Sequence, residues 1–243
     1  MGDDITAALF AGPELQDGDD LCAFVRRTCP DIVAGHGFGD LAALVAADAV
    51  DVRVATELAQ LRERLVADAD DELPGGLLAV LDIYADAAAR TICALSDVRV
   101  ARHDSPSRVV VAGTEDALRA ARQAAAEHHI DVAEVPAPGA LHSPAMSDAA
   151  RRFARALTEV GFRPPALQVY SAVTAEPVFC PIAELARSLE APVLWTQTAR
   201  ALSAAGATRY VEADGERALS ELVRDSLSRH RRTGVAAKLV KVV

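Results

Sequence analysis

The chain has 243 residues, of which 51% are hydrophobic and 4% aromatic, and its formal net charge is −10. This length suits one large domain, or one domain with a smaller insert, and it can enclose a sizeable hydrophobic core. The negative charge argues against a nucleic-acid partner, because a protein that binds phosphate backbones normally carries a basic patch.

Cysteine spacing and the N-terminal segment exclude several further classes. The cysteines form no C-x-x-C pair, so neither a zinc site nor a disulfide framework is predicted. The N-terminal segment is acidic and does not resemble a secretory signal, and no run reaches about 18 uninterrupted apolar residues. We therefore expect a cytoplasmic protein with no metal and no membrane partner. The four cysteines are Cys22, Cys29, Cys93 and Cys180.

A strand, a tight glycine turn and a helix are predicted in the first third of the chain. The apolar run from Asp31 ends at Gly35, and an Ala- and Leu-rich helical pattern begins at Asp40. A second helical pattern runs from about residue 52 to 69, and the Pro-Gly-Gly cluster at residues 74–76 indicates a break after it.

The spacing of the pattern changes between residues 77 and 137. Read in order, this segment predicts β-α-β-β-α-β, which is the split ferredoxin-like unit, and Thr114 or Glu115 opens its second helix. We interpret it as an inserted subdomain.

The remaining chain alternates helices and strands. An amphipathic helix begins near Ser147, a strand follows within LQVYSAV, and residues 196–229 read as helix, strand and helix. The basic C-terminal stretch is left open as a frayed end, a short strand or a docking arm. The alternation predicts an α/β core with a mainly parallel sheet, formed by residues 1–76 and 138–243 around the 77–137 subdomain.

The glycine turn carries the most specific chemical signal. The segment GHGFG has the outline of a G-x-S-x-G nucleophile elbow, with Gly37 at the position of the serine. Such an elbow lifts a nucleophile above the sheet and directs backbone N–H groups at a developing oxyanion. Gly35 and Gly39 permit the turn, and Gly37 adopts a strained dihedral more easily than serine, but Gly37 has no hydroxyl to acylate.

Two simpler interpretations compete with an elbow. A phosphate-binding G-x-G-x-x-G loop requires glycine at position 40, but this position holds Asp40, whose carboxylate repels phosphate. A glycine turn without chemistry fits these five residues equally well. The choice depends on the rest of the chain.

Seven segments, in order, resemble the malonyl-CoA:ACP transacylase and polyketide synthase acyltransferase family. They match the family's GHS-x-G-E, M-R-G-x-x-M, N-S-P-x-Q, A-F-H-S, P-V-Y-S-N-V-T-G, P-V-x-W and E-x-G-P-G blocks. The segments are GHGFGDLAALVAADAVD, LRERLVADA, DSPSRVVVAG, ALHSPAM, PALQVYSAVTAEPV, LEAPVLWT and YVEADGERAL.

The resemblance implies an α/β-hydrolase-like parallel sheet with a ferredoxin-like subdomain, and roles for individual residues. His142 matches the catalytic base, and Gly37 takes the place of the nucleophile. Phe38 matches the backbone oxyanion donor, and Ser188 matches the residue whose carbonyl orients the histidine. Arg62 matches the arginine that binds the carboxylate of a malonyl-type substrate, for which a guanidinium fork is suited.

The resemblance also implies supporting residues and partners. His36 would lie beneath the elbow with a hydrogen-bonding role, and Leu141 would replace the phenylalanine that precedes the base in malonyl-selective members. The implied partners are an acyl carrier protein, a ketosynthase or another synthase subunit, and an acyl-CoA or acyl-ACP thioester. No cofactor is implied.

Simpler roles remain open for two of these residues. A histidine before Ser-Pro is often a neighbour of a helix cap, although the order of the blocks favours a base at His142. Arg62 could pair with Glu57, Asp68 or another nearby acid on a solvated helix face instead of lining a pocket.

Several departures from the family accompany Gly37. Only 34 residues precede Gly35 and no G-Q-G-x-Q occurs, so we expect the family's first strand to be missing. Asp40 replaces a glutamate, Asp104 replaces an asparagine, and Asp-Gly-Glu at residues 214–216 replaces Gly-Pro-Gly.

Three hypotheses for function follow. The first is a non-catalytic scaffold or partner in polyketide or fatty-acid biosynthesis. The second is acyl transfer or thioester hydrolysis with His142 as general base and no acyl-serine. The third is an active transacylase with an engineered knockout at Gly37.

Overall fold

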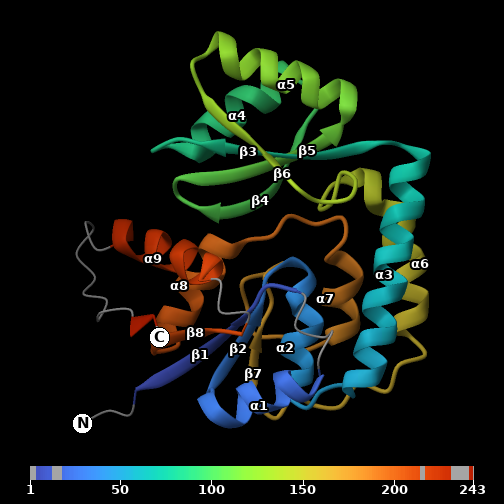
Figure 1. Ribbon diagram of the computed structural model, residues 1–243, viewed down its shortest axis with the longest axis vertical. Coiled ribbons are helices and arrows are strands. Elements are labelled where there is room, and N and C mark those ends of the chain that lie inside the picture. The colour runs from blue at the N-terminus through green and yellow to red at the C-terminus, as the bar shows by residue number, and fades with distance from the viewer. Residues whose placement is uncertain (1–3, 13–17, 214–216, 231–240, 243) are drawn as a thin grey trace.

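The computed structural model describes residues 4–12, 18–213, 217–230 and 241–242. It contains a five-stranded sheet and a separate four-stranded sheet, which lie one above the other in an elongated molecule (Figure 1). No helix in the described part of the chain has both the length and the apolar character needed to cross a membrane.

The larger sheet is parallel, as the alternation of strands and helices predicts. Its strand order is β7-β2-β1-β8-β9, and every neighbouring pair runs parallel. The strands are β1 (Ile5–Phe10), β2 (Ile32–Gly35), β7 (Gln168–Tyr170), β8 (Ala207–Glu212) and β9 (Lys241–Val242).

Strand β1 corrects one expectation from the sequence. We expected the first strand of the family to be absent, but Ile5–Phe10 forms the middle strand of this sheet, between β2 and β8. Its last five residues are buried, because the segment is apolar enough to be covered on both faces. The expectation that the sheet lacks its first strand is therefore wrong.

Helices cover both faces of the parallel sheet. Phe10 and Val33 point to one face and belong to a cluster with α1, α2, α3, α6 and α7, whereas Leu9 and Ile32 point to the other and pack with α8 and α9. This alternation follows from the period of two along a strand. The helices are α1 (Gly18–Thr28), α2 (Asp40–Ala46), α3 (Val52–Glu72), α6 (Ser147–Leu157), α7 (Pro181–Arg187), α8 (Trp195–Ala204) and α9 (Ala218–His230).

The smaller sheet is antiparallel and has the predicted β-α-β-β-α-β element order. Its strand order, β4-β5-β3-β6, is that of a ferredoxin-like unit. Thr114 caps its second helix, since Thr114 Oγ1 accepts a hydrogen bond from the Ala117 N–H. The elements are β3 (Gly75–Leu81), α4 (Ala85–Leu95), β4 (Arg99–Ser105), β5 (Arg108–Thr114), α5 (Glu115–Glu127) and β6 (Asp131–Val135).

The glycines at the start of this sheet differ from the prediction. We read residues 74–76 as a break, but only Leu73 and Pro74 separate α3 from β3, and both Gly75 and Gly76 belong to the strand. A Cβ on Gly75 would lie 2.6 Å from the carbonyl oxygen of Gly113, so close approach of β5 explains this glycine.

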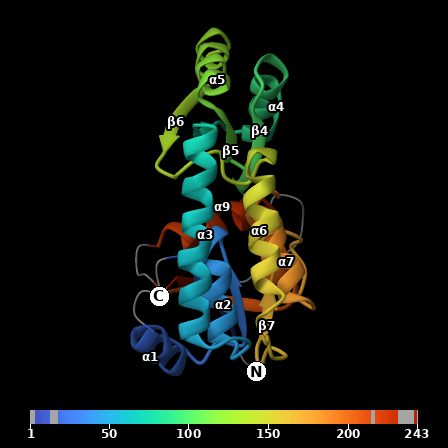
Figure 2. The ribbon, with the colours of Figure 1, turned by 90° about the vertical axis from the view of Figure 1, so that its right-hand side faces the viewer.

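The smaller sheet is joined to the core of the larger one through helix α3 and through strand β4. Helices α3 and α6 run side by side along one side of the molecule, and α3 leads directly into β3 (Figure 2). On strand β4, the His103 N–H donates to the Val193 carbonyl at 2.8 Å, and the Val193 N–H donates to the Ala101 carbonyl at 2.9 Å. We call this contact between β4 and residue 193 the seam.

Candidate functional site

The turn after β2 is shaped by two glycines that no other residue could replace. A short 3₁₀ helix, η2 (Gly37–Gly39), connects β2 to α2. A Cβ on Gly35 would lie 2.2 Å from the Gly39 carbonyl, and a Cβ on Gly39 would lie 1.9 Å from the carbonyl oxygen of Phe10. Both distances are far below van der Waals contact, so Gly35 is required by the close approach of the turn to β2 and Gly39 by its packing against β1.

Gly37, in contrast, has room for a side chain. Its φ of +57° lies in the left-handed region, as expected for the strained position of an elbow. Among the described residues other than its chain neighbours, only His142 Nε2 would lie within 4 Å of a Cβ placed there, at 3.8 Å. Residue 37 therefore faces the imidazole of His142 across a small gap.

His142 is held by hydrogen bonds to two neighbouring carbonyls. Its Nδ1 lies 2.7 Å from the Ser188 carbonyl oxygen, and its backbone N–H donates to the Leu189 carbonyl at 2.8 Å. Because a carbonyl oxygen only accepts, the proton is on Nδ1 and the Nε2 lone pair faces Gly37. His142 itself has a φ of +59°, which is uncommon outside glycine and concentrates at functional sites.

The environment keeps the His142 imidazole neutral. Burial, together with the charges of Arg102 and His36, lowers the pKa of His142 to about 3, against the raising effect of the Ser188 hydrogen bond. At neutral pH the ring is therefore a hydrogen-bond acceptor at Nε2.

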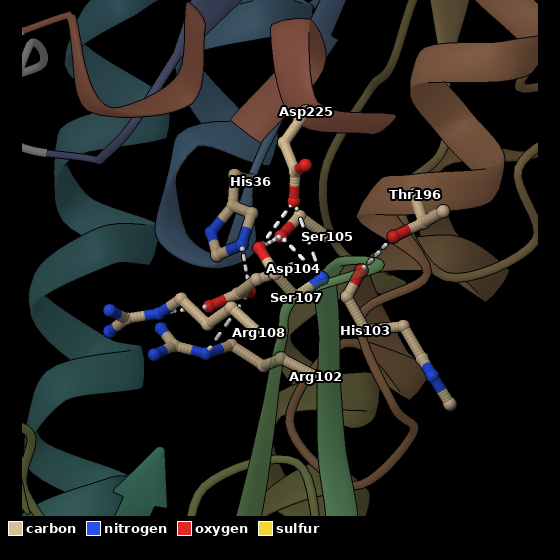
Figure 3. Close-up of polar contacts among 9 residues, drawn as sticks. All are labelled: His36, Arg102, His103, Asp104, Ser105, Ser107, Arg108, Thr196 and Asp225. Atoms are coloured by element: carbon tan, nitrogen blue, oxygen red, sulfur yellow. Dashed lines mark hydrogen bonds and ion pairs between the residues drawn. The ribbon is translucent and has the colours of Figure 1, made fainter. Parts of the chain in front are cut away.

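His36 lies next to the turn and contacts the smaller sheet. Its Nε2 lies 3.0 Å from Asp104 Oδ1 of β4, and its ring packs edge-on against Trp195 with centroids 5.2 Å apart (Figure 3). Burial alone raises the pKa of Asp104, but the His36 hydrogen bond and the Arg102 and Arg108 charges outweigh it and bring that pKa to about 2. Asp104 is thus ionised, and His36 donates the hydrogen bond.

Arg62 of α3 is buried, with a side chain that is 1% exposed. Its Nη1 donates to Asp40 Oδ1 at 2.7 Å, its Nη2 donates to the Phe38 carbonyl at 3.0 Å, and its guanidinium lies 4.4 Å from the centre of the Phe38 ring. The alternative of a pairing with Glu57 or Asp68 on a solvated face is wrong.

The directions of the side chains on α3 explain why Arg62 does not pair with Asp68. Asp68 lies further up α3 and pairs with Arg152 of α6 at 3.2 Å, whereas Arg62 points inward to the start of α2. Asp40 of α2 therefore pairs with Arg62 in place of an acid on α3.

All seven predicted site residues line one cavity. It has a volume of about 220 Å³ and lies between the glycine turn, the His142 loop and the smaller sheet. The predicted residues in its wall are His36, Gly37, Phe38, Arg62, Leu141, His142 and Ser188. The structure brings these residues together from segments more than 150 positions apart in the chain.

Sequence reasoning missed one charged residue in the same wall. Arg102 of β4 lines the cavity, and its Nε lies 3.6 Å from Asp104 Oδ1. The alternation in VRVARH was the available signal, since Arg102 occupies an inward position between buried Ala101 and Asp104 at a bulge of β4. Within the described residues, no cluster of three or more His, Cys, Asp or Glu side chains could hold a metal ion.

Comparison with known proteins identifies the family. Residues 10–233 match the family model for the acyl transferase domain, so the chain belongs to the acyl transferase domain family. The resemblance seen in the seven sequence segments is thereby confirmed.

Individual relatives come from polyketide biosynthesis. The chain is 33% identical over 228 residues to the polyketide biosynthesis protein ThaF of Burkholderia thailandensis, covering 90% of this chain and 19% of ThaF. It is 29% identical over 204 residues to the polyketide biosynthesis malonyl CoA-acyl carrier protein transacylase PksC of Bacillus subtilis, covering 80% of this chain and 68% of PksC. The chain therefore spans about a fifth of ThaF and about two thirds of PksC.

A solved structure shares the fold over nearly the whole chain. A type II polyketide synthase malonyl-transacylase, solved in complex with its acyl-carrier protein, superposes with a TM-score of 0.84 and 19% sequence identity. The match covers 99% of this chain and 96% of that one. The two-sheet architecture described above is thus the acyltransferase fold.

Proposed function

We propose that this protein serves polyketide or fatty-acid biosynthesis as an acyltransferase-like scaffold or partner that lacks serine-dependent transacylation. The observation that carries the proposal is the glycine at position 37 of the turn. A Cβ on Gly37 would lie 3.8 Å from His142 Nε2. In this proposal His142 is the base, and residue 37, which its Nε2 faces, has no side-chain oxygen. An acyl-enzyme cannot form at that position, because the covalent step requires a side-chain nucleophile.

The nearest serine does not replace the missing nucleophile. Ser143 follows His142 directly, but its Oγ donates to the Ala140 carbonyl at 2.6 Å and its residue is buried. This hydroxyl caps the turn before α6, since it also accepts from the Ala145 N–H. It is committed to local structure and is not among the residues that line the cavity.

The other predicted roles form part of the proposal. The Ser188 carbonyl orients His142, the Phe38 N–H stabilises a developing oxyanion, and Arg62, Leu141 and His36 shape the substrate pocket. Residues 1–76 and 138–243 form the acyltransferase-like core, with residues 77–137 as the ferredoxin-like subdomain that closes the cavity.

A second function is favoured by the neutral His142 imidazole. His142 Nε2 would take the proton of a carrier-protein thiol, and the sulfur would attack the acyl thioester. The C–S bond to CoA would then break, and the CoA thiolate would recover the proton. A water molecule in place of the thiol would give hydrolysis. The pKa of about 3 makes His142 a weak base at neutral pH, so we expect this route to be slow.

The proposed partner is an acyl carrier protein, with a ketosynthase or another synthase subunit as a further one. The name of PksC includes an acyl carrier protein, and the matching malonyl-transacylase was solved bound to one. Because the fold that presents the cavity is shared with that transacylase, the same kind of partner is the reasonable one to test.

Intact-protein mass spectrometry tests the proposal. The full chain is incubated with malonyl-, methylmalonyl- or acetyl-CoA, with and without a phosphopantetheinylated carrier protein from a polyketide pathway. We expect no mass increase on this protein and a measurable complex with the carrier protein by titration calorimetry. An acyl adduct mapped to any residue would refute the lack of an acyl-enzyme, and the absence of carrier binding would refute the partner role.

A further inference from the structure

Two imidazole rings line the cavity, and their hydrogen bonds decide which nitrogen of each neutral ring carries the proton. His142 donates from Nδ1 to the Ser188 carbonyl at 2.7 Å, so its lone pair is on Nε2. His36 donates from Nε2 to the ionised Asp104 at 3.0 Å, so its lone pair is on Nδ1. The cavity therefore holds two candidate general bases, one on a neutral carbonyl and one on a carboxylate.

The Nδ1 atom of His36 is open to the cavity. Within the described residues it makes no hydrogen bond, and it is not among the buried polar atoms that lack a partner, so solvent reaches it. Because His36 is only 8% exposed and lines the cavity, this opening faces the cavity. Figure 3 shows the second ring nitrogen of His36 turned away from Asp104, on the side toward which the Arg102 guanidinium extends.

The His36 ring is held in this orientation from several sides. Its backbone N–H donates to the Phe10 carbonyl at 2.9 Å, and Trp195 packs against the ring with the two planes at 77°. The hydrogen bond to Asp104 fixes the remaining side. A base that is held in place by its neighbours does not have to be reoriented during the reaction.

The partner of each ring affects how well that ring accepts a proton. A carboxylate stabilises the imidazolium that forms, as the aspartate of a Ser-His-Asp triad does. Asp104 is buried and has a pKa of about 2, so it keeps its negative charge at neutral pH. His142 has only a carbonyl partner, and its pKa of about 3 makes it a poor base at neutral pH.

Other charges also surround the pair of His36 and Asp104. Arg102 Nε lies 3.6 Å from Asp104 Oδ1, and Arg108 Nε donates to Asp104 Oδ2 at 3.2 Å. Both keep the carboxylate ionised, and both oppose a positive charge on His36, whereas the direct contact with Asp104 favours one. The charged or titratable groups around the pair are Arg62, Arg102, Arg108, His142 and, held by Ser107, Asp225.

We propose that His36, supported by Asp104, is a general base that activates a water molecule in this cavity for hydrolysis of an acyl thioester. His36 Nδ1 takes one proton of the water while the water oxygen attacks the thioester carbonyl carbon. The C–S bond then breaks, and the proton passes from His36 to the departing thiolate. The products are a free carboxylic acid and a thiol, and His36 is neutral again.

This reaction needs no side chain at position 37. A Cβ on Gly37 would meet only His142 Nε2 within 4 Å among the described residues that are not its chain neighbours. Glycine therefore leaves unfilled space directly after His36. The inference rests on the proposed function for the class of substrate, and it goes beyond that function by assigning a second base and a reaction with water.

The release of free CoA from acetyl-CoA or malonyl-CoA measures the reaction. The full chain is incubated with each thioester, and free CoA is followed by liquid chromatography, because the exposed cysteines of this protein would consume a thiol reagent. We expect faster release than without protein, and no acyl adduct in acid-quenched intact-mass spectra. The rate should rise with pH as His36 loses its proton.

Matched histidine variants decide which ring is the base. His36→Gln should lower the rate about 10²-fold or more, because a positioned general base is lost. His142→Gln should lower it less than His36→Gln does. His103→Gln should change it less than twofold, since this imidazole of β4 pairs with Asp86 and does not line the cavity.

Asp104→Asn separates catalysis from a structural contact. The asparagine keeps the size of the side chain and an oxygen that accepts from His36, but it removes the charge. We expect a lower rate and a pH–rate profile whose midpoint moves to lower pH, because the imidazolium is no longer stabilised. A purely structural contact would leave the midpoint unchanged. This variant also supplies the measurement if His36→Gln does not fold.

Five results would overturn the inference. They are no CoA release by the wild type, equal rates in His36→Gln and His103→Gln, a larger loss in His142→Gln than in His36→Gln, an unchanged midpoint in Asp104→Asn, and a transient acyl adduct. The assay contains no carrier protein, so a failed carrier-binding experiment leaves hydrolysis standing. Absence of hydrolysis, in turn, leaves the carrier-binding role standing.

Discussion

The two walls of the cavity that face each other are held in different ways. On one wall Gly37 has a φ of +57°, and on the other His142 has a φ of +59°. The glycine turn is fixed by backbone contacts of Gly35 and Gly39, whereas the His142 loop is fixed by hydrogen bonds to the carbonyls of residues 188 and 189. The close contacts that fix the turn are therefore made by Gly35 and Gly39, and residue 37 contributes its left-handed backbone conformation.

Replacing Gly39 should destabilise the glycine turn that forms the first wall. In Gly39→Ala the new Cβ would lie 1.9 Å from the Phe10 carbonyl oxygen, which is backbone and cannot move aside. We expect a loss of about 4 kcal/mol or more in the free energy of unfolding. Urea denaturation followed by circular dichroism measures it.

Gly37→Ala is the matched control for that variant. In the described part of the chain its Cβ meets no atom beyond the neighbouring residues closer than 3.8 Å, so the left-handed backbone is the main cost, at about 1–2 kcal/mol. Similar losses in the two variants would show that the turn is not held by the backbone contacts described.

Gly37→Ser should test whether the two walls still work together. Its hydroxyl would point at His142 Nε2, and we expect slow covalent labelling by malonyl-CoA in intact-mass spectra. Adding His142→Ala to this variant should slow labelling about 10²–10⁴-fold, because the general base is lost.

Two other outcomes of that experiment are informative. Labelling that is equally fast with and without His142 would mean that the imidazole does not activate residue 37. Rapid transfer onward to a carrier protein in Gly37→Ser alone would favour the hypothesis of a knocked-out transacylase over a scaffold.

The buried His142 in the second wall should make the stability of the protein depend on pH. The folded pKa of His142, about 3, lies below its ordinary value of 6.5, so the unfolded chain binds the proton first as pH falls. Stability should therefore decrease below pH 6.5, by about 2 kcal/mol between pH 7 and pH 5. Asp104, with a pKa of about 2, contributes only below pH 4.

His142→Asn isolates this effect, because the amide keeps a donor for the Ser188 carbonyl but does not titrate. Urea unfolding of both proteins at pH 5 and pH 7 should show the decrease in the wild type alone. An equal decrease in the variant would assign the pH dependence to other groups.

The smallest effect is expected at Ser188, where the site uses only the backbone. Ser188→Ala removes the Oγ donation to the Leu185 carbonyl, which should cost less than about 1 kcal/mol. The NMR titration of the His142 imidazole should be unchanged. A shifted titration would mean that the Ser188 side chain also acts on the ring.

The sequence could predict the features that depend on local pattern. The change of period after residue 77 predicts the antiparallel unit, and the spacing of Gly35 and Gly39 predicts the turn. The order of the seven segments then leads to the family, which a single glycine turn could not.

The sequence could not predict features that depend on distant partners. Strand β1 was missed because the expected G-Q-G-x-Q does not follow it, although ITAALF is as apolar as the buried β2. The alternative left open for Arg62 was a nearby acid such as Glu57 or Asp68, but its partner Asp40 lies 22 residues away on α2. Arg102 was missed although the alternation in VRVARH was a local signal, because β4 is bulged at this residue and the sequence does not show where a bulge interrupts the alternation.

The seam ties strand β4 of the smaller sheet to the core that carries the larger one. Val193 exchanges backbone hydrogen bonds with β4 in both directions, and Asp225 of α9 accepts hydrogen bonds from Ser107 of the β4–β5 turn (Figure 3). Walls joined in this way do not need to close over the ligand. Association should then be a single diffusional step, with an observed rate that rises linearly with thioester concentration in stopped-flow measurements and shows no plateau from a closing motion.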